Sequence, residues 1–236
     1  MVQIPHNLFW TSGWDSTYRL LEIIFTEKQA VQPIYIIDED RKSLKNELHA
    51  LEAILNKIET KSPEARNLIL PIKYYKKSDI IITPEIKMAF QQIRTYIKIG
   101  SQYDWISSLC ETENLKNVEL CIFKNERTDI LFNSIKPEQK ENVTALEETK
   151  TNAAIQLVFK HYLFPVLDIK KMDMYTVSKK NNWLDIMNLT WFCHTPKNGK
   201  PCGKCNPCKI TIKEGLGFRV PFLNRIRGYI KRFLKK

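Results

Sequence analysis

Short apolar runs and segments with helical spacing alternate along the first third of the chain. Residues 7–10, 31–37 and 67–75 are apolar or β-branched runs bounded by turn residues, which favours strands. Between them, apolar residues recur with helical spacing over 18–25 and 44–58, which indicates two amphipathic helices. Because successive parallel strands need crossover connections, this β-α-β-α-β order predicts a parallel sheet.

The rest of the chain is predicted to be mostly helical. Three longer helices are expected over residues 85–97, 103–110 and 153–163. Two small helices are expected over residues 174–180 and 183–189, and they lead into a cluster of cysteines. Helices between parallel strands are the usual cover for the faces of such a sheet.

Fewer strands are predicted in this second part. Residues 118–123 form a fourth strand candidate, and residues 164–167 form a short edge strand. Residues 128–149 are charged and poorly periodic, which indicates a loop or an insertion. The predicted fold class is therefore α/β, an open parallel sheet with helices on both faces.

The composition is that of an ordinary globular protein. The 236 residues are 43% apolar and 27% charged, enough for the core of one large or two small domains. No apolar run approaches the roughly 18 residues that span a bilayer. The first six residues carry no basic or apolar leader pattern, so we expect a cytoplasmic protein, with a peripheral membrane location as an alternative.

The net charge of +11 lies entirely at the end of the chain. Residues 195–236 contain 12 Lys or Arg and a single acid, Glu214, whereas the other 194 residues carry 25 basic and 25 acidic side chains. A nucleic-acid enzyme more often spreads its basic residues over a binding face. The positive charge is therefore a property of the C-terminal segment and says little about the substrate of the remaining 194 residues.

The loop after the first strand carries the first functional signal. Residues 11–17 read Thr-Ser-Gly-Trp-Asp-Ser-Thr, and ligands of open parallel sheets bind beyond the carboxyl ends of the strands. Small residues at a helix N-terminus form an anion site from backbone N–H groups, with Ser16 and Thr17 as further donors. The alternative is a simple N-cap, with Asp15 or Ser16 beginning an ordinary helix. Gly-x-Gly-x-x-Gly and Gly-Lys-Ser/Thr loops are both missing from the sequence, so those two nucleotide classes lack support.

Four of the six cysteines lie within 16 residues and carry the second signal: Cys193, Cys202, Cys205 and Cys208. Four thiolates at this density suit tetrahedral Zn²⁺, and because no coordination position is left for substrate, the role is structural. An iron–sulfur cluster is the alternative, although the spacing does not fit the ferredoxin run. The isolated Cys110 and Cys121 are predicted to be small buried residues.

Residues 11–16 resemble the Ser-Gly-Gly-x-Asp-Ser loop of PP-loop ATPases, the N-type ATP pyrophosphatases. The resemblance implies an adenine nucleotide alpha hydrolase-like sheet in which this loop binds the β- and γ-phosphates of ATP. Asp15 and Ser16 become the implied catalytic residues, with Asp15 serving Mg²⁺. Asp38, at the end of the second strand, would contact the adenosine, although carboxylates at strand ends also form ordinary turns. The implied ATP-binding residues are Thr11, Ser12, Gly13, Asp15, Ser16, Thr17 and Asp38.

The loop and the cysteine spacing together resemble the 7-cyano-7-deazaguanine synthase family. Residues 202–208, Cys-Gly-Lys-Cys-Asn-Pro-Cys, match that family's structural zinc motif. The resemblance implies an ATP-dependent, C–N bond forming ligase of queuosine biosynthesis. It would adenylate a small carboxylate, 7-carboxy-7-deazaguanine, releasing pyrophosphate, and would use ammonia to form an amide and then a nitrile.

The middle of the chain departs from that family. The family's Pro-Gly-Arg-Asn segment corresponds to residues 99–102, which lack the Arg. Glu126 and Asp129 are the implied substrate contacts, but the Ser-Gly-Tyr-Pro-Asp-Cys-Arg motif that should follow them is missing from the sequence. Two alternatives therefore stay open. One is a divergent enzyme with another acceptor, including a protein amine that receives a deazaguanine, and the other is a non-catalytic nucleotide-binding module.

Residues 218–236 are predicted to form a basic amphipathic tail. Its apolar residues from 222 to 234 share one helical face, which suits an anionic membrane surface, a protein or nucleic-acid partner, or packing on its own domain. We predict a PP-loop ATPase domain over 1–190, a zinc-binding segment over 191–217 and this tail. A homodimer is left open.

Overall fold

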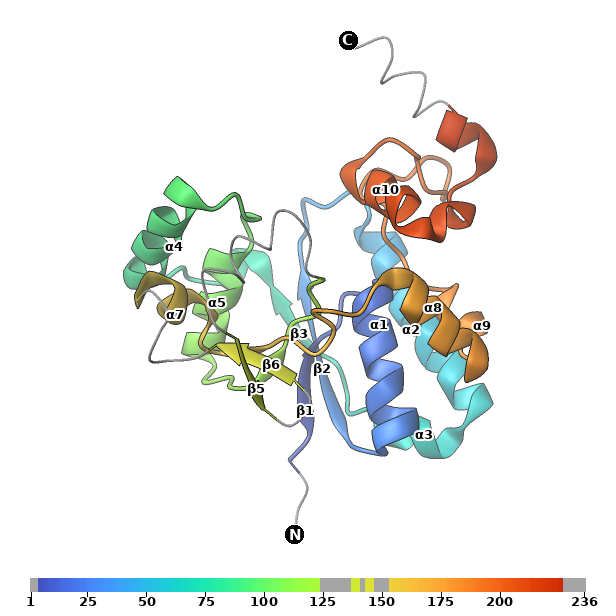
Figure 1. The fold of residues 1–236 in the computed structure, drawn as a ribbon, viewed down its shortest axis with the longest axis horizontal. Helices are drawn as coiled ribbons and strands as arrows, with labels where there is room; N and C mark the ends of the chain where they lie inside the picture. Colours follow the sequence, from blue (N-terminus) through green and yellow to red (C-terminus); the bar gives the residue numbers. More distant parts are fainter. Residues whose placement is uncertain (1–3, 124–136, 141–142, 147–152, 227–236) are drawn as a thin grey trace. The chain divides into compact units, whose positions relative to one another are not determined.

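The computed structural model describes residues 4–123, 137–140, 143–146 and 153–226. The chain forms two compact units that alternate along the sequence (Figure 1). The first, here the sheet unit, contains Met1–Phe9, Gln29–Ile37 and Ile69–Asp168. The second, here the helical unit, contains Trp10–Lys28, Asp38–Leu68 and Ile169–Lys236. The boundaries predicted at residues 190 and 217 stay a prediction.

The sheet unit contains a five-stranded parallel sheet, in the order β3-β2-β1-β4-β7. Its strands are β1 (His6–Phe9), β2 (Val31–Ile37), β3 (Lys73–Lys76), β4 (Val118–Glu119) and β7 (Tyr162–Leu163). Leu8 of the central strand is fully buried and lies opposite Pro33 on one side and Glu119 on the other. The predicted α/β class with an open parallel sheet is confirmed. The strand order reverses beside β1, which is where such sheets bind ligands.

Two strands differ from their predicted positions because proline interrupts the backbone ladder. The edge strand is Tyr162–Leu163 rather than 164–167, since Pro165 has no N–H to donate. The predicted helix over 153–163 accordingly ends earlier, as α7 (Ala153–Phe159). The third strand begins at Lys73 instead of residue 67, with an isolated bridge at Ile69 before Pro71. The fourth strand keeps only Val118–Glu119 of the predicted 118–123.

Part of the expected loop over 128–149 is an antiparallel hairpin. Its strands are β5 (Pro137–Lys140) and β6 (Val143–Leu146), with Pro137 opposite Leu146. The interpretation as a loop is therefore wrong for these residues. Strands of four residues are too short to show the apolar alternation on which the prediction relied. The rest of the expected loop lies outside the described residues.

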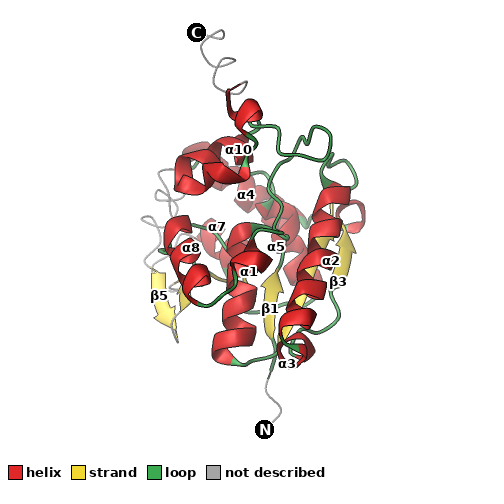
Figure 2. Ribbon diagram, turned by 90° about the vertical axis from the view of Figure 1, so that its right-hand side faces the viewer, coloured by secondary structure: helices red, strands yellow, loops and turns green. Residues whose placement is uncertain are grey.

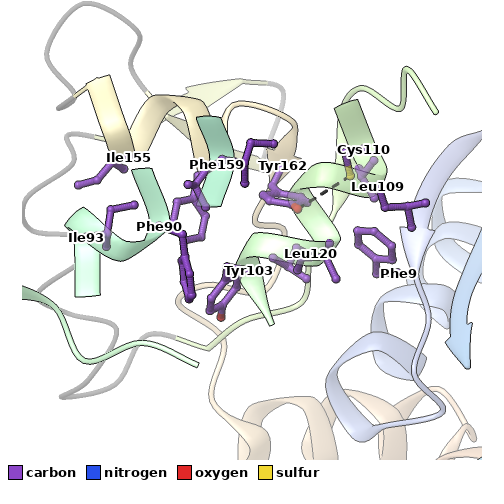
Figure 3. Packing of buried hydrophobic residues seen from close by; sticks show 14 of the residues in the cluster. Phe9, Phe90, Ile93, Tyr103, Leu109, Cys110, Leu120, Ile155, Phe159 and Tyr162 are labelled. Atoms are coloured by element: carbon purple, nitrogen blue, oxygen red, sulfur yellow. Dashed lines mark hydrogen bonds between the residues drawn. The ribbon is translucent and has the colours of Figure 1, made fainter. Parts of the chain in front are cut away.

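The core of the sheet unit is formed where α4 (Pro84–Tyr96), α5 (Tyr103–Thr112) and α7 pack together with the sheet (Figure 3). The rings of Tyr103 and Phe159 have centroids 5.1 Å apart. Cys110 is buried against the Tyr162 hydroxyl, and burial raises the pKa of its thiol to about 12. Cys110 is therefore a buried, unreactive thiol as predicted, whereas Cys121 is only half-buried.

The helical unit is built from α1 (Trp14–Leu21) with its π-helical extension η1 (Glu22–Glu27), and from helices that pack around it (Figure 2). The ring of Trp183 lies 6.5 Å from Tyr18 and 5.8 Å from Phe25, so it joins α1 and η1 to the chain before α9. No helix among the described residues is both long and apolar enough to span a membrane. The remaining helices of the unit are α2 (Leu44–Lys61), α3 (Pro63–Asn67), α8 (Lys171–Lys180), α9 (Leu184–Met187), α10 (Asn206–Thr211), η3 (Ile212–Leu216) and η4 (Gly217–Arg219).

Phe159→Ala should lower the free energy of unfolding by about 3–5 kcal/mol, the usual cost of deleting a buried aromatic ring. Phe159 is fully buried and contacts Tyr103 and Tyr162. Urea unfolding of the full chain measures the change. Met88→Ala, which removes an exposed side chain from α4, is the matched control and should change stability by less than about 0.5 kcal/mol. Equal effects of the two variants would contradict this packing.

Candidate functional site

The loop after β1 leads into helix α1 through one residue in the left-handed conformation. Gly13 is the N-cap of α1, and its carbonyl accepts the Thr17 N–H at 3.0 Å. Ser12 has φ +55°, the left-handed region that glycine adopts most easily. Glycine is also the residue that the PP-loop pattern carries at this position. The loop therefore keeps that conformation with serine in place of glycine.

The residues implied to bind ATP divide into two groups. Thr11, Gly13 and Asp15 line a pocket of about 240 Å³ within the helical unit. Ser16 is buried, and its hydroxyl lies 3.3 Å from both the N–H and the hydroxyl of Thr11. Thr17 is fully buried and accepts the Trp10 indole N–H at 3.0 Å, so its hydroxyl is engaged in packing.

Two buried donors of this loop lack partners. The Ser12 hydroxyl and the Trp14 indole N–H make no hydrogen bond among the described residues. Trp14 also lines the pocket. Since buried donors are nearly always paired, with protein, water or ligand, these two groups are the donors of the loop that could still accept a partner.

Lys171, the first residue of α8, joins two acidic side chains at the pocket. Its ammonium Nζ lies 2.5 and 2.6 Å from the two carboxylate oxygens of Asp15. The same nitrogen lies 3.6 Å from Oε2 of Glu214. Burial raises the pKa of Glu214, and the neighbouring Asp15 carboxylate acts in the same direction while Lys171 opposes it. The site thus contains one ammonium group shared by two carboxylates.

Arg219 of η4 lies between two aromatic rings. Its guanidinium carbon is 4.9 Å from the Trp14 ring centroid and 5.0 Å from that of Phe192, and Nη2 donates to the Thr190 carbonyl at 2.5 Å. Burial lowers its pKa to about 10. No carboxylate among the described residues forms an ion pair with it. A half-buried cation with no counter-charge in the described part of the chain makes this wall of the pocket attractive to anions.

Asp38 lies in a polar network rather than on the pocket wall. Its carbonyl accepts the Arg41 N–H at 3.0 Å, and its carboxylate is 3.8 Å from Arg41 Nε. Arg41 also reaches the buried Glu47 at 3.3 Å, and the Ser43 hydroxyl donates to Glu47 at 2.6 Å. Arg41 and Glu47 line the pocket, so Asp38 is connected to it through Arg41.

Several charged residues at the pocket escape prediction from the sequence: Arg41, Glu47, Lys171 and Arg219 in its lining, and Glu214 beside Lys171. The only signal for Glu214 is that it is the single acid among the last 42 residues. Lys171 and Arg219 are two of 37 basic residues, and nothing in their sequence context separates them from solvated lysines and arginines. The implied substrate contacts Glu126 and Asp129 lie outside the described residues.

The four clustered cysteines converge as predicted. Their sulfur atoms all lie within 4.8 Å of one another. Cys202 and Cys208 are 3.9 Å apart, and Cys193 and Cys205 are 3.8 Å apart. Tetrahedral zinc with Zn–S bonds of about 2.3 Å requires sulfurs about 3.8 Å apart. The cluster therefore fits a metal ion such as Zn²⁺.

Hydrogen bonds to sulfur favour the thiolate form that a metal requires. The backbone N–H of Cys202 donates to the sulfur of Cys193 at 3.2 Å, and that of Cys205 donates to Cys202 at 3.3 Å. Burial opposes ionisation of Cys202, but bonds from Thr195 and from two backbone N–H groups lower its pKa overall. Trp191 and Phe192 pack against the cluster.

The cysteine segment also supports the loop after β1. The Trp191 N–H donates to the Ser12 carbonyl at 2.9 Å, and the Trp191 indole donates to the Cys193 carbonyl at 2.8 Å. Trp191 and Phe192 line the pocket together with Trp14 and Arg219. The two sequence motifs, one at each end of the chain, are therefore parts of one structural unit.

Residues 134–216 match the family model described as Queuosine biosynthesis protein QueC. The matched part is about a third of the chain and includes Lys171, Glu214 and the four cysteines, but not the loop over residues 11–17. No curated protein and no solved structure gives a significant match. The match supports the predicted resemblance, so the chain is similar to a QueC-like family of ATP-using synthases.

Cys208→Ser should lower the bound zinc from one ion per chain to a small fraction of that, because three thiolates hold Zn²⁺ less tightly than four. Elemental analysis of the purified full chain measures the metal. Cys121→Ser, which changes a half-buried cysteine outside the cluster, is the control and should keep one zinc. Iron with visible charge-transfer absorption in the unaltered protein would contradict zinc and favour the iron–sulfur alternative.

Proposed function

We propose that this QueC-like chain is an ATP-dependent ligase that activates a small carboxylate by adenylation, with release of pyrophosphate. The observation that carries the proposal is the group of unpaired donors and cations around one pocket of the helical unit. Ser12 and Trp14 supply buried donors that have no partner in the described part of the chain, and Lys171 and Arg219 supply positive charge. Adenylation requires such a site, because negative charge accumulates on the leaving pyrophosphate.

In this proposal the loop after β1 binds and orients the phosphates of ATP. The N-terminus of α1 directs backbone N–H groups and the positive end of the helix dipole toward them. The indole N–H of Trp14 and the guanidinium of Arg219 contribute further donors along the same wall. Positioning and charge stabilisation are the whole contribution, and the chemistry requires no nucleophilic Ser or Cys.

The ion pair of Asp15 and Lys171 would supply one group to the metal and one to the phosphates of ATP. In the structure the Asp15 carboxylate accepts both short contacts of the Lys171 ammonium. We infer that Asp15 and Glu214 supply carboxylate oxygens to Mg²⁺, which would neutralise phosphate charge. Lys171 would contact the pyrophosphate, to which its ammonium is well suited as a point charge.

A structural Zn²⁺ in the cysteine cluster would hold the pocket wall in place. Cys193, Cys202, Cys205 and Cys208 would be its ligands, which leaves no open coordination position. The metal would order a segment that carries Trp191 and Phe192, and these rings position Arg219 and the carbonyl contact to Ser12.

For the acceptor we propose 7-carboxy-7-deazaguanine with ammonia as the nitrogen donor, on the strength of the QueC similarity. A second candidate, in which another acceptor such as a protein amine replaces ammonia or the carboxylate, is favoured by one observation. The sequence lacks both the Arg in residues 99–102 and the motif that should follow Asp129. Product mass after incubation with each acceptor distinguishes the two candidates.

Asp15→Asn should reduce the formation of AMP and pyrophosphate from ATP by at least about 100-fold, because a neutral amide no longer holds Mg²⁺. Nucleotide products are measured on zinc-loaded protein with ATP, Mg²⁺, 7-carboxy-7-deazaguanine and ammonium. Asp173→Asn, on the exposed face of α8, is the control for the loss of one charge and should keep full activity. Full activity of Asp15→Asn with a native circular dichroism spectrum would contradict the proposal.

Arg219→Gln should weaken the binding of pyrophosphate at least about tenfold, since a charge-assisted hydrogen bond is lost. Isothermal titration calorimetry measures this affinity without requiring turnover. Arg94→Gln, an exposed arginine of α4, is the matched control and should bind pyrophosphate normally. Unchanged affinity in Arg219→Gln would assign this arginine to packing alone.

A further inference from the structure

The last described segment of the helical unit exposes large apolar side chains. Phe218, Phe222, Leu223 and Ile226 are 55%, 66%, 68% and 40% exposed. Ile210 and Ile212, at the end of α10 and the start of η3, are also exposed. Isolated exposed apolar residues are common, but four within nine residues indicate an interaction surface.

A polar anchor holds this segment with its apolar residues outward. Residues 222–226 are helical, and the Asn224 side chain donates to the Pro201 carbonyl at 2.8 Å. Gly203 has φ +75° and approaches so closely that a Cβ on it would lie 2.2 Å from the Asn224 carbonyl oxygen. The helical turn of residues 222–226 is therefore attached to the cysteine segment through Asn224, while Phe222 and Leu223 remain exposed.

The charge around these apolar side chains is positive. Residues 195–226 carry seven basic residues and one acid, Glu214, which is already paired with Lys171. Exposed Lys209 and Lys213 flank the exposed isoleucines. The Arg225 guanidinium lies 5.6 Å from the centroid of the exposed Phe222 ring, so charge and apolar surface are interleaved.

We propose that residues 209–226 form a membrane-contacting surface that inserts its apolar side chains into the interface of an anionic bilayer. Such an interface offers an apolar phase for Phe222 and Leu223 and anionic headgroups for the lysines and arginines around them. A nucleic acid would satisfy the basic residues but would leave the aliphatic Leu223 and Ile226 in water. Ile210 and Arg219 of this stretch also line the pocket, whereas Phe222, Leu223 and Ile226 do not, and the proposal does not depend on the ligase activity.

The test is co-sedimentation of the full chain with sucrose-loaded vesicles. We expect binding to phosphatidylcholine vesicles that contain phosphatidylserine, little binding to phosphatidylcholine alone, and weaker binding as salt is raised. Phe222→Ser/Leu223→Ser should lower the partition coefficient at least about tenfold, because two large apolar groups no longer leave water. Ile81→Ser/Met88→Ser removes two comparably exposed apolar side chains from the sheet unit and should bind as the unaltered protein does.

A second variant keeps the test valid if the first one is unstable. Lys209→Gln/Lys213→Gln should lower the partition into phosphatidylserine vesicles severalfold without changing the apolar side chains. Thermal unfolding confirms that each variant is folded. The proposal is overturned if the full chain does not sediment with either vesicle type, or if sedimentation is unchanged in the folded Phe222→Ser/Leu223→Ser variant. Retention of a single-stranded oligonucleotide without any vesicle binding would also overturn it and would assign the surface to nucleic acid.

Discussion

The ammonium group of Lys171 holds the candidate pocket together, because it touches two carboxylates that are far apart in the sequence. It contacts Asp15 at the start of α1 and Glu214 in η3. Without it, two half-buried carboxylates would lie close together, and burial, with a smaller contribution from the Asp15 carboxylate, already raises the pKa of Glu214. Replacing Lys171 alone would therefore destabilise the fold more than replacing Lys171 together with both carboxylates. The arrangement of charged side chains at the N-terminus of α1 therefore depends on Lys171.

A second constraint links the loop to the cysteine cluster. The Trp191 N–H is bonded to the Ser12 carbonyl, and its ring is bonded to the Cys193 carbonyl. Ser12 holds a left-handed conformation that costs a non-glycine residue energy, so the hydrogen bond to its carbonyl helps to keep it there. A metal that orders the cysteines would thus act on the loop as well. This connection gives a physical reason for the two motifs to occur in one protein.

Local patterns predicted the fold well where a single element decides the outcome. The second strand has the predicted bounds, the long helix begins at Leu44 as expected, and the four cysteines converge. The misses have both local and non-local causes. The bounds of the edge strand depend on which residues pair with β4. Pro165 has no N–H for this pairing, so residues 164–167 do not form the strand. Likewise Lys171 is 156 residues from Asp15, and no sequence period can report a pairing at that separation.

The basic residues of the stretch 195–236 differ in their surroundings, although the sequence alone does not distinguish them. Counted along the chain, Arg219 is one of twelve similar charges, yet it is stacked between two aromatic rings, whereas the adjacent Phe218 is more than half exposed. Two neighbouring residues of η4 thus face different environments. A ligand on the exposed surface can alter the shape of the pocket only if η4 has two conformations and the ligand binds one of them more tightly. Since Arg219 is held by Trp14, Phe192 and a carbonyl, the pocket resists such a shift.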